Sequence, residues 1–224
     1  MRKTNYIFLL FIVAKAQAMD VYCNGAPTVP HTNGGGNVAL TVVIDPAVYV
    51  GPNASVCEYA TVLGNTQIDD QVRVYGYARI NDGSVIVDNA QIFGNASLTS
   101  SPPNLAIRVS DNALVYGNAK ISEGATIKAN AKVFENARVA GSAIVDESAK
   151  VYGSASIIGN AQIKGNSKIH GVASIGQNVI TSGTTNICAV KQYPANSVLT
   201  DVLNCPTSAQ LNIKKKLRWS RNEN

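Results

Sequence analysis

Apolar residues recur with a period of six along most of the chain. From residue 119 onward a small residue stands at every sixth position, with an aliphatic residue two places after it, as far as Ala173 and Ile175. The same frame continues upstream to Ile107, and a separate block covers residues 42–98. Apolar residues two apart lie on one face of a short strand. Gly-Asn and Asp-Asn pairs between these strands tolerate the left-handed backbone of a sharp corner. The pattern therefore predicts an all-β, single-stranded parallel β-helix.

A second pattern predicts the number of sides. In every third hexad the residue after the aliphatic is usually aromatic, as in the series Cys57, Tyr75, Phe93, Tyr116, Phe134, Tyr152 and His170. These positions are 18 residues apart, apart from one interval of 23 between Phe93 and Tyr116. Eighteen residues make three hexads, so each coil is a triangle, and twenty-two hexads predict about seven coils. The five extra residues predict an insertion loop at residues 99–105.

These repeats resemble the hexapeptide-repeat superfamily of bacterial β-helix proteins, best known through acyltransferases related to the UDP-N-acetylglucosamine acyltransferase. The resemblance covers roughly residues 42–175 and rests on an aliphatic residue followed four positions later by a small one. It implies a left-handed helix, whereas the spacing alone leaves open a right-handed helix of the bactofilin kind. Because one fold serves many functions, the resemblance brings no reaction with it.

The first residues have the form of a secretory signal peptide. Arg2 and Lys3 precede an apolar run over residues 6–14, and Ala18 ends a small-residue cleavage motif. We expect cleavage after Ala18, no membrane-spanning segment thereafter, and a periplasmic or secreted bacterial protein. The predicted organisation is a signal peptide (1–18), an N-terminal cap (19–41), the β-helix (42–175), a C-terminal cap with a disulfide loop (176–206) and a short basic amphipathic α-helix (207–224).

Export changes the interpretation of the four cysteines, Cys23, Cys57, Cys188 and Cys205. In an oxidising compartment they predict two disulfides, and four cysteines allow three pairings. We favour Cys23 with Cys57 and Cys188 with Cys205, since each pair lies toward one end of the repeats. The rival is a structural zinc site, which no paired CxxC spacing supports.

Catalytic chemistry has few candidates here. Acyltransferases of the similar superfamily typically use a histidine as general base, which makes His31 and His170 the candidates of the alternative hypothesis. We expect His31 to be a cap or loop residue and His170 to stack in the aromatic series. Two histidines are too few for the three-histidine zinc site of the γ-carbonic anhydrase branch, and no GxSxG motif occurs. We expect no cofactor.

Three aspartates, Asp70, Asp88 and Asp111, recur at intervals of 18 and 23 residues and so share one corner of the prism. Stacked carboxylates repel unless they are solvated, bonded to turn backbone or bridged by a cation such as calcium. Bonds to the turn backbone are the simpler interpretation, and calcium is the alternative.

The aromatic series is the main candidate for a binding surface. We expect the six residues from Tyr75 to His170 in this series to form an outward stripe, and an exposed apolar stripe usually marks an interface. Its partner is a neighbouring prism in a homo-oligomer, with a trimer favoured, the chain's own tail, or a glycan. The basic tail residues Lys214, Lys215, Lys216, Arg218 and Arg221 lie on an amphipathic helix that packs on the prism or touches an anionic surface.

Charge sharpens this interpretation. The chain has 19 Lys and Arg against 14 Asp and Glu, a net charge of +5. Without the three cations of the signal peptide the net charge is +2, and the tail from residue 207 carries +4, so the prism itself is slightly acidic. That distribution does not suggest a nucleic-acid-binding groove. We expect an exported, non-catalytic β-helix protein with a structural, adhesive or surface-interaction role; the alternative is an acyltransferase-like enzyme with a histidine base.

Overall fold

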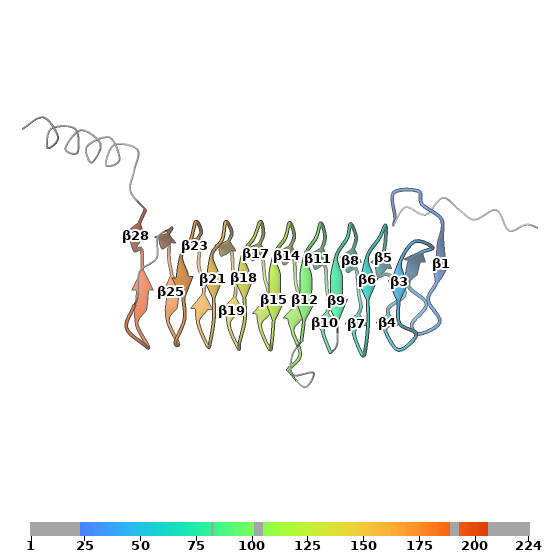
Figure 1. The fold of residues 1–224 in the computed structure, drawn as a ribbon, viewed down its shortest axis with the longest axis horizontal. Coiled ribbons are helices and arrows are strands. Elements are labelled where there is room, and N and C mark those ends of the chain that lie inside the picture. The colour runs from blue at the N-terminus through green and yellow to red at the C-terminus, as the bar shows by residue number, and fades with distance from the viewer. Residues whose placement is uncertain (1–22, 82, 101–104, 189–192, 206–224) are drawn as a thin grey trace, which may run out of the picture.

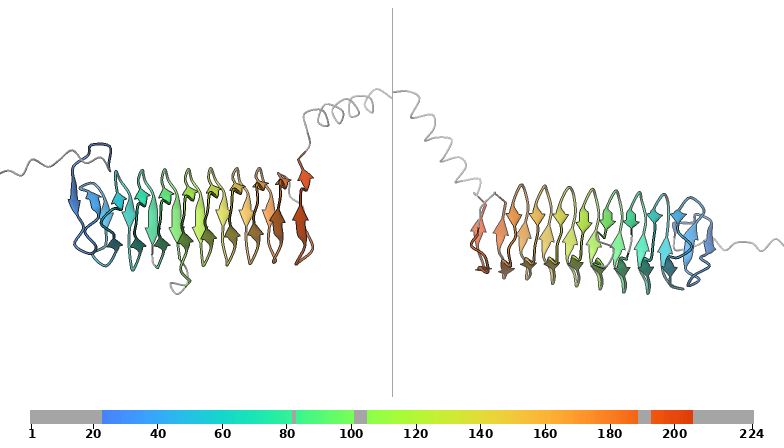
Figure 2. Two further views of the ribbon diagram at one scale, coloured as in Figure 1. Left: turned by 180° about the vertical axis from the view of Figure 1, so that it is seen from behind. Right: turned by 60° about the horizontal axis from the view of Figure 1, so that its bottom comes forward.

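Stacked coils form a three-sided prism in the computed structural model, which describes residues 23–81, 83–100, 105–188 and 193–205 (Figures 1 and 2). The described residues form strands of two or three residues, joined by turns at the three corners of each coil. The all-β parallel solenoid predicted by the hexad pattern is confirmed. Each side of the prism is one sheet, and the strands of successive coils pair in register along it.

Sheet A contains eleven strands in the described residues. Its order is β1 (Thr28–Pro30), β2 (Asn37–Ala39), β5 (Ser55–Val56), β8 (Arg73–Val74), β11 (Gln91–Ile92), β14 (Leu114–Val115), β17 (Lys132–Val133), β20 (Lys150–Val151), β23 (Lys168–Ile169), β26 (Asn186–Ile187) and β28 (Leu203–Asn204). All its pairs are parallel except β1 with β2, which is antiparallel.

Sheets B and C contain eight and nine strands in the described residues and are parallel throughout. Sheet B is formed by β3 (Val43–Ile44), β6 (Thr61–Val62), β9 (Arg79–Asn81), β12 (Ser97–Thr99), β15 (Lys120–Ser122), β18 (Arg138–Val139), β21 (Ser156–Ile157) and β24 (Ser174–Ile175). Sheet C is formed by β4 (Tyr49–Val50), β7 (Gln67–Ile68), β10 (Val85–Ile86), β13 (Arg108–Val109), β16 (Thr126–Ile127), β19 (Ile144–Val145), β22 (Gln162–Ile163), β25 (Ile180–Ser182) and β27 (Val198–Thr200).

The core is the inside of the prism, filled by the two apolar positions of each hexad. Ile121, Ile127 and Val133, one from each side of the prism, are at most 1% exposed, and so are the alanines that precede them by two residues. Alanine fits at these corners because three walls converge there. In most strands the residue before the inward aliphatic points outward; Ser55 of β5 is an exception, fully buried like Val56.

The coil count is a correction to the sequence-based prediction. Each coil contributes one strand to sheet C, whose nine strands make about nine coils where seven were predicted. Parallel pairing begins at β2 and continues beyond residue 175 through β25 to β28. The later coils escaped detection because polar residues replace the apolar ones: Thr181 and Thr185 are fully buried, and the Thr185 hydroxyl donates to the Ser182 and Leu199 carbonyls.

The register across the predicted insertion accounts for the interval of 23. Val85 pairs with Arg108 and Gln91 pairs with Leu114, 23 residues on, whereas the neighbouring pairs are separated by 18. The strands on both sides of the insertion therefore keep the register of the coils, and the additional residues fall between Thr99 and Arg108 in the sequence. The predicted signal peptide (1–18) and the basic helix (207–224) lie outside the described residues.

Strand β1 covers the N-terminal edge of sheet A. Strand β1 folds back on β2 in antiparallel register, with Thr28 opposite Ala39. An uncovered edge strand would expose unpaired N–H and C=O groups to other chains. The N-terminal cap predicted over residues 19–41 thus includes β1, while β2 already belongs to the first coil.

Glycines at the corners yield a prediction about stability. Gly94 has φ +69°, and a Cβ there would lie 3.0 Å from the backbone nitrogen of Gly117 in the next coil. We expect Gly94→Ala to lower the free energy of unfolding by about 1–3 kcal/mol, measured by urea denaturation. Gly124→Ala is the matched control, because its φ is not positive and its Cβ would lie at an ordinary 3.6 Å from the Leu105 Cβ. Equal losses in the two variants would contradict this explanation.

Candidate functional site

The outer face of sheet A carries a continuous stack of rings, the aromatic ladder, formed by Tyr75, Phe93, Tyr116, Phe134, Tyr152 and His170. Neighbouring ring centroids are 4.7–4.9 Å apart and the ring planes differ by at most 4°. The structure thus brings together all six residues that the spacing of 18 and 23 singled out. Stacking follows from the fold, because strands pair at about 4.8 Å, which suits offset ring packing.

The ladder differs in one respect from the exposed stripe expected from the sequence. All six rings are half-buried, since the four inner rings have both faces covered by neighbours. Outward they present ring edges and, at Tyr75, Tyr116 and Tyr152, phenol groups. A sugar therefore has no free ring face to stack on within the ladder. Ring edges carry the positive part of the aromatic quadrupole, so this surface is complementary to negative groups.

A disulfide closes each end of the ladder. Cys57 occupies the ladder position one coil before Tyr75 and is bonded to Cys23, with their Cα atoms 5.4 Å apart. Cys188 occupies the position one coil after His170 and is bonded to Cys205, also with a Cα separation of 5.4 Å. Both bonds match the favoured pairing, and the zinc alternative for the cysteines fails. The two bonds lie near the two ends of the prism, one coil beyond each end of the ladder.

His170 is held by contacts on three sides. Its ring stacks on Tyr152, its Nε2 lies 2.9 Å from the Asn186 Oδ1, and the Cys205 Sγ lies 3.5 Å from the same nitrogen. His170, Cys188 and Cys205 also lie close enough together to ligate a metal. Thiolates are the metal-binding form of cysteine, and these sulfurs are in a disulfide, so the trio does not fit a metal centre.

His31 lies at the opposite end of the prism, in the turn that follows β1. Its Nε2 donates to the Val48 carbonyl oxygen, 2.9 Å away. The two histidines therefore belong to different ends and each serves a local contact. The structure does not bring them together.

The three corner aspartates form backbone hydrogen bonds between coils. The Asp70 carboxylate accepts from the Asp88 N–H, Asp88 accepts from the Asp111 N–H, and Asp111 accepts from the Ala129 N–H, at 2.9–3.1 Å. Glu147 accepts from the Gly165 N–H in the same way. These bonds support the turn-backbone interpretation over calcium, since each carboxylate already has a donor in the next coil.

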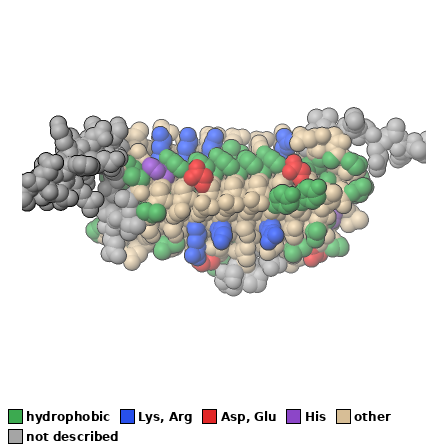
Figure 3. All heavy atoms as spheres, turned by 45° about the horizontal axis from the view of Figure 1, so that its top comes forward, with side chains coloured by type: hydrophobic (Ala, Val, Ile, Leu, Met, Phe, Trp, Pro, Cys, Tyr) green, Lys and Arg blue, Asp and Glu red, His purple; other side chains and the backbone are tan. Residues whose placement is uncertain are grey.

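A basic row, missed in the sequence, runs beside the ladder on sheet A. Lys132, Lys150 and Lys168 are in direct register on β17, β20 and β23, and Arg73 lies 5.8 Å over the Tyr75 ring. Figure 3 shows basic side chains along one flank of the apolar ladder. The sequence contains the pattern that predicts this row. Each lysine precedes the inward aliphatic residue in every third hexad and stands two residues before a ladder residue.

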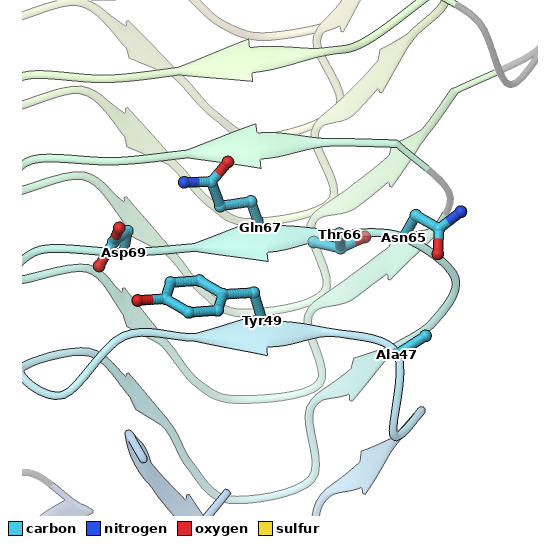
Figure 4. Close-up of a pocket in the computed structure, with 6 residues that line it drawn as sticks. All are labelled: Ala47, Tyr49, Asn65, Thr66, Gln67 and Asp69. Atoms are coloured by element: carbon cyan, nitrogen blue, oxygen red, sulfur yellow. The ribbon is translucent and has the colours of Figure 1, made fainter. Parts of the chain in front are cut away.

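The surface has two shallow hollows of note. One, of about 400 Å³, lies along the basic row and is lined by Asn130, Lys132, Ser148, Lys150, Asn166 and Lys168. The other, of about 440 Å³, lies near the N-terminal end, where Tyr49, Gln67 and Asp69 surround it with Ala47, Asn65 and Thr66 (Figure 4). Neither hollow contains a histidine.

Comparison with known proteins does not assign a function, so the proposal below rests on the geometry of the site. A scan against protein-family models and a search of curated proteins found no match to this chain. In the described residues, no helix has the length and apolar character needed to cross a membrane. The predicted basic residues of the tail, 214–221, lie outside the described residues.

The ladder tyrosines yield a pH-dependent prediction. Burial raises the pKa of Tyr75, Tyr116 and Tyr152 above 10, and the nearby Glu135 carboxylate adds to this for Tyr116 and Tyr152. The folded state therefore holds these protons more tightly than the unfolded state. Their contribution to stability is fully present below pH 10 and is lost as the pH rises through the folded-state pKa.

We expect the free energy of unfolding to fall with rising alkaline pH, and to fall less in the variant Tyr116→Phe/Tyr152→Phe. Denaturant unfolding at a series of pH values measures this. The control is Tyr59→Phe/Tyr77→Phe, which alters a stacked but exposed pair away from the ladder. A pH dependence that is unchanged in the ladder variant would count against buried phenols as its cause.

Proposed function

We propose that this chain is an exported, non-catalytic β-solenoid with a structural, adhesive or surface-interaction role, and that the outer face of sheet A is its contact surface. The observation that carries the proposal is the combination on this face of the aromatic ladder and the basic row. The ladder is packed through successive coils and closed by a disulfide at each end, so it holds outward groups at fixed spacing.

Export is supported by the cysteines. Both disulfides are consistent with a periplasmic or extracellular location, because such bonds persist in oxidising compartments. The signal peptide expected at residues 1–18 agrees with this.

The alternative, an acyltransferase-like enzyme, has less support. A general base needs a free nitrogen within reach of the reacting hydroxyl or amine. Each histidine bonds through Nε2, His31 to the Val48 carbonyl and His170 to the Asn186 Oδ1, so Nδ1 of each keeps its lone pair. Against catalysis stand the stacking of the His170 ring on Tyr152 and the absence of a histidine from both hollows described above. Acyl thioester donors are also cytoplasmic, which conflicts with export.

Self-association, expected as a trimer, is part of the proposal, but the basic row would bring like charges together across an axis of symmetry. An apolar patch on the first three coils is better suited to it. There Tyr59 and Tyr77 stack with ring centroids 5.3 Å apart, each more than half exposed, and Val43 lies nearby on sheet B. The mass of the full chain in sedimentation equilibrium tests this part.

The His170→Phe variant separates the two functions. A phenyl ring restores stacking on Tyr152 but has no nitrogen. We expect the variant to keep its fold by circular dichroism, and neither it nor the wild type to transfer an acetyl group from acetyl-coenzyme A to amino or hydroxyl sugars. Acyl transfer by the wild type that is lost in His170→Phe and retained in Tyr152→Phe would overturn the proposal in favour of the enzyme.

A further inference from the structure

We propose that the hollow along the basic row binds a linear polyuronate, a glycan with one carboxylate on each sugar, lying parallel to the prism axis. This inference rests on the proposed function, because it names the ligand of the same face. The hollow is lined by Lys132, Lys150 and Lys168, and by the corner residues Asn130, Ser148 and Asn166.

Charge is the first argument. Lys132, Lys150 and Lys168 stand directly opposite one another on adjacent parallel strands, about 4.8 Å apart. Like charges at this spacing destabilise a sheet. In the described part of the chain, no acidic side chain forms an ion pair with any of the three. Two corner carboxylates lie three residues from a lysine of the row, Glu135 after Lys132 and Glu147 before Lys150. They accept hydrogen bonds from the Gly153 and Gly165 N–H groups. An anionic ligand would relieve the repulsion that the chain itself leaves uncompensated.

Periodicity is the second argument. Each coil supplies the hollow with one ammonium group and one amide or hydroxyl group, two residues apart in sequence. A polyuronate supplies one carboxylate and free hydroxyls on each sugar, and the length of a pyranose is close to the rise of one coil, about 4.8 Å. One sugar can therefore face one coil. Because successive sugars are rotated about the glycan axis, each coil can offer its ammonium group to a carboxylate or its amide or hydroxyl group to a sugar hydroxyl, whichever the facing sugar presents.

The ladder supports the same ligand. Phe134, Tyr152 and His170 directly follow the strands of the three lysines, two residues further on. Their stacked faces leave the positively polarised edges outward, so the strip beside the lysines also favours anions. The register of the strands, the charge of the lysines and the orientation of the rings thus all favour an extended anionic chain as the ligand.

Other polyanions fit less well. A DNA strand carries one phosphate per 3.4 Å of duplex axis, which falls out of register with the coils after one or two phosphates. An anionic bilayer is a plane, whereas this row is one lysine wide and lies in a hollow. Sheet B also has basic residues, but Ser97 separates Arg79 from Lys120 and Arg138 along the sheet.

The test is isothermal titration calorimetry of the full chain with a short oligogalacturonate. We expect binding that weakens with added salt, and no binding of the fully methyl-esterified oligomer, which has the same sugars without charge. The variant Lys132→Gln/Lys150→Gln/Lys168→Gln should lose about tenfold or more in affinity, because three contacts between an ammonium group and the anionic glycan are removed.

The matched control removes three charges from sheet B, as Arg79→Gln/Lys120→Gln/Arg138→Gln. It should bind within about twofold of the wild type, because exposed charges remote from the ligand contribute little. Equal losses in both variants would show attraction by net charge alone and overturn the proposal. Absence of oligogalacturonate binding would overturn it too, as would binding to vesicles of phosphatidylserine and phosphatidylcholine in its place.

These failures are distinguishable from failure of the proposed function. If the oligomer does not bind but the chain shows no acyl transfer, only the polyuronate inference is lost. If the recovered oligomer is shortened, the non-catalytic function is contradicted instead.

Discussion

The pairing of each residue with the one 18 positions later is the constraint on which the rest of the structure depends. Backbone hydrogen bonds set this register on all three sides. Pairs across the insertion are separated by 23 residues and the last pair of sheet A, β26 with β28, by 17, and the strands still stack coil on coil. Every side chain therefore meets its equivalent in the next coil at about 4.8 Å. A residue type therefore stabilises the prism at a given position only if its side chain packs well against the side chain at the equivalent position of the next coil.

Different residue types meet this condition in different ways. Aliphatic and alanine columns fill the interior, and rings stack in the ladder. Asparagines form amide ladders, as where Asn95 donates to Asn118 and Asn118 to Asn136. Corner carboxylates avoid one another's charge by accepting an N–H from the next coil. The lysines of sheet A have no such arrangement, and for that reason their column is the part of the surface most in need of a partner.

Sequence reasoning predicted the features that repeat strictly. The three-sided solenoid, the ladder and the insertion followed from spacing, and the cysteine pairing from position along the repeats. The coil count was wrong because Thr181 and Thr185 replace apolar residues, and a hydrophobic pattern does not show that threonines fill the interior there. The Thr185 hydroxyl is hydrogen-bonded inside, whereas that of Thr181 has no partner among the described residues. Half-burial of the rings was missed since it depends on ring orientation. The basic row was visible as a period of 18 but was obscured by the slightly acidic charge of the prism.

The outer face of sheet A is the proposed functional face of the prism. Amide chemical shifts of the isotopically labelled chain, recorded during titration with a short oligogalacturonate, test this most directly. The account predicts that shifts concentrate in β17, β20, β23 and the turns carrying Asn130, Ser148 and Asn166, with little change on sheet B. Shifts centred on sheet B, on the hollow beside Tyr49 or at the ends of the prism would contradict it.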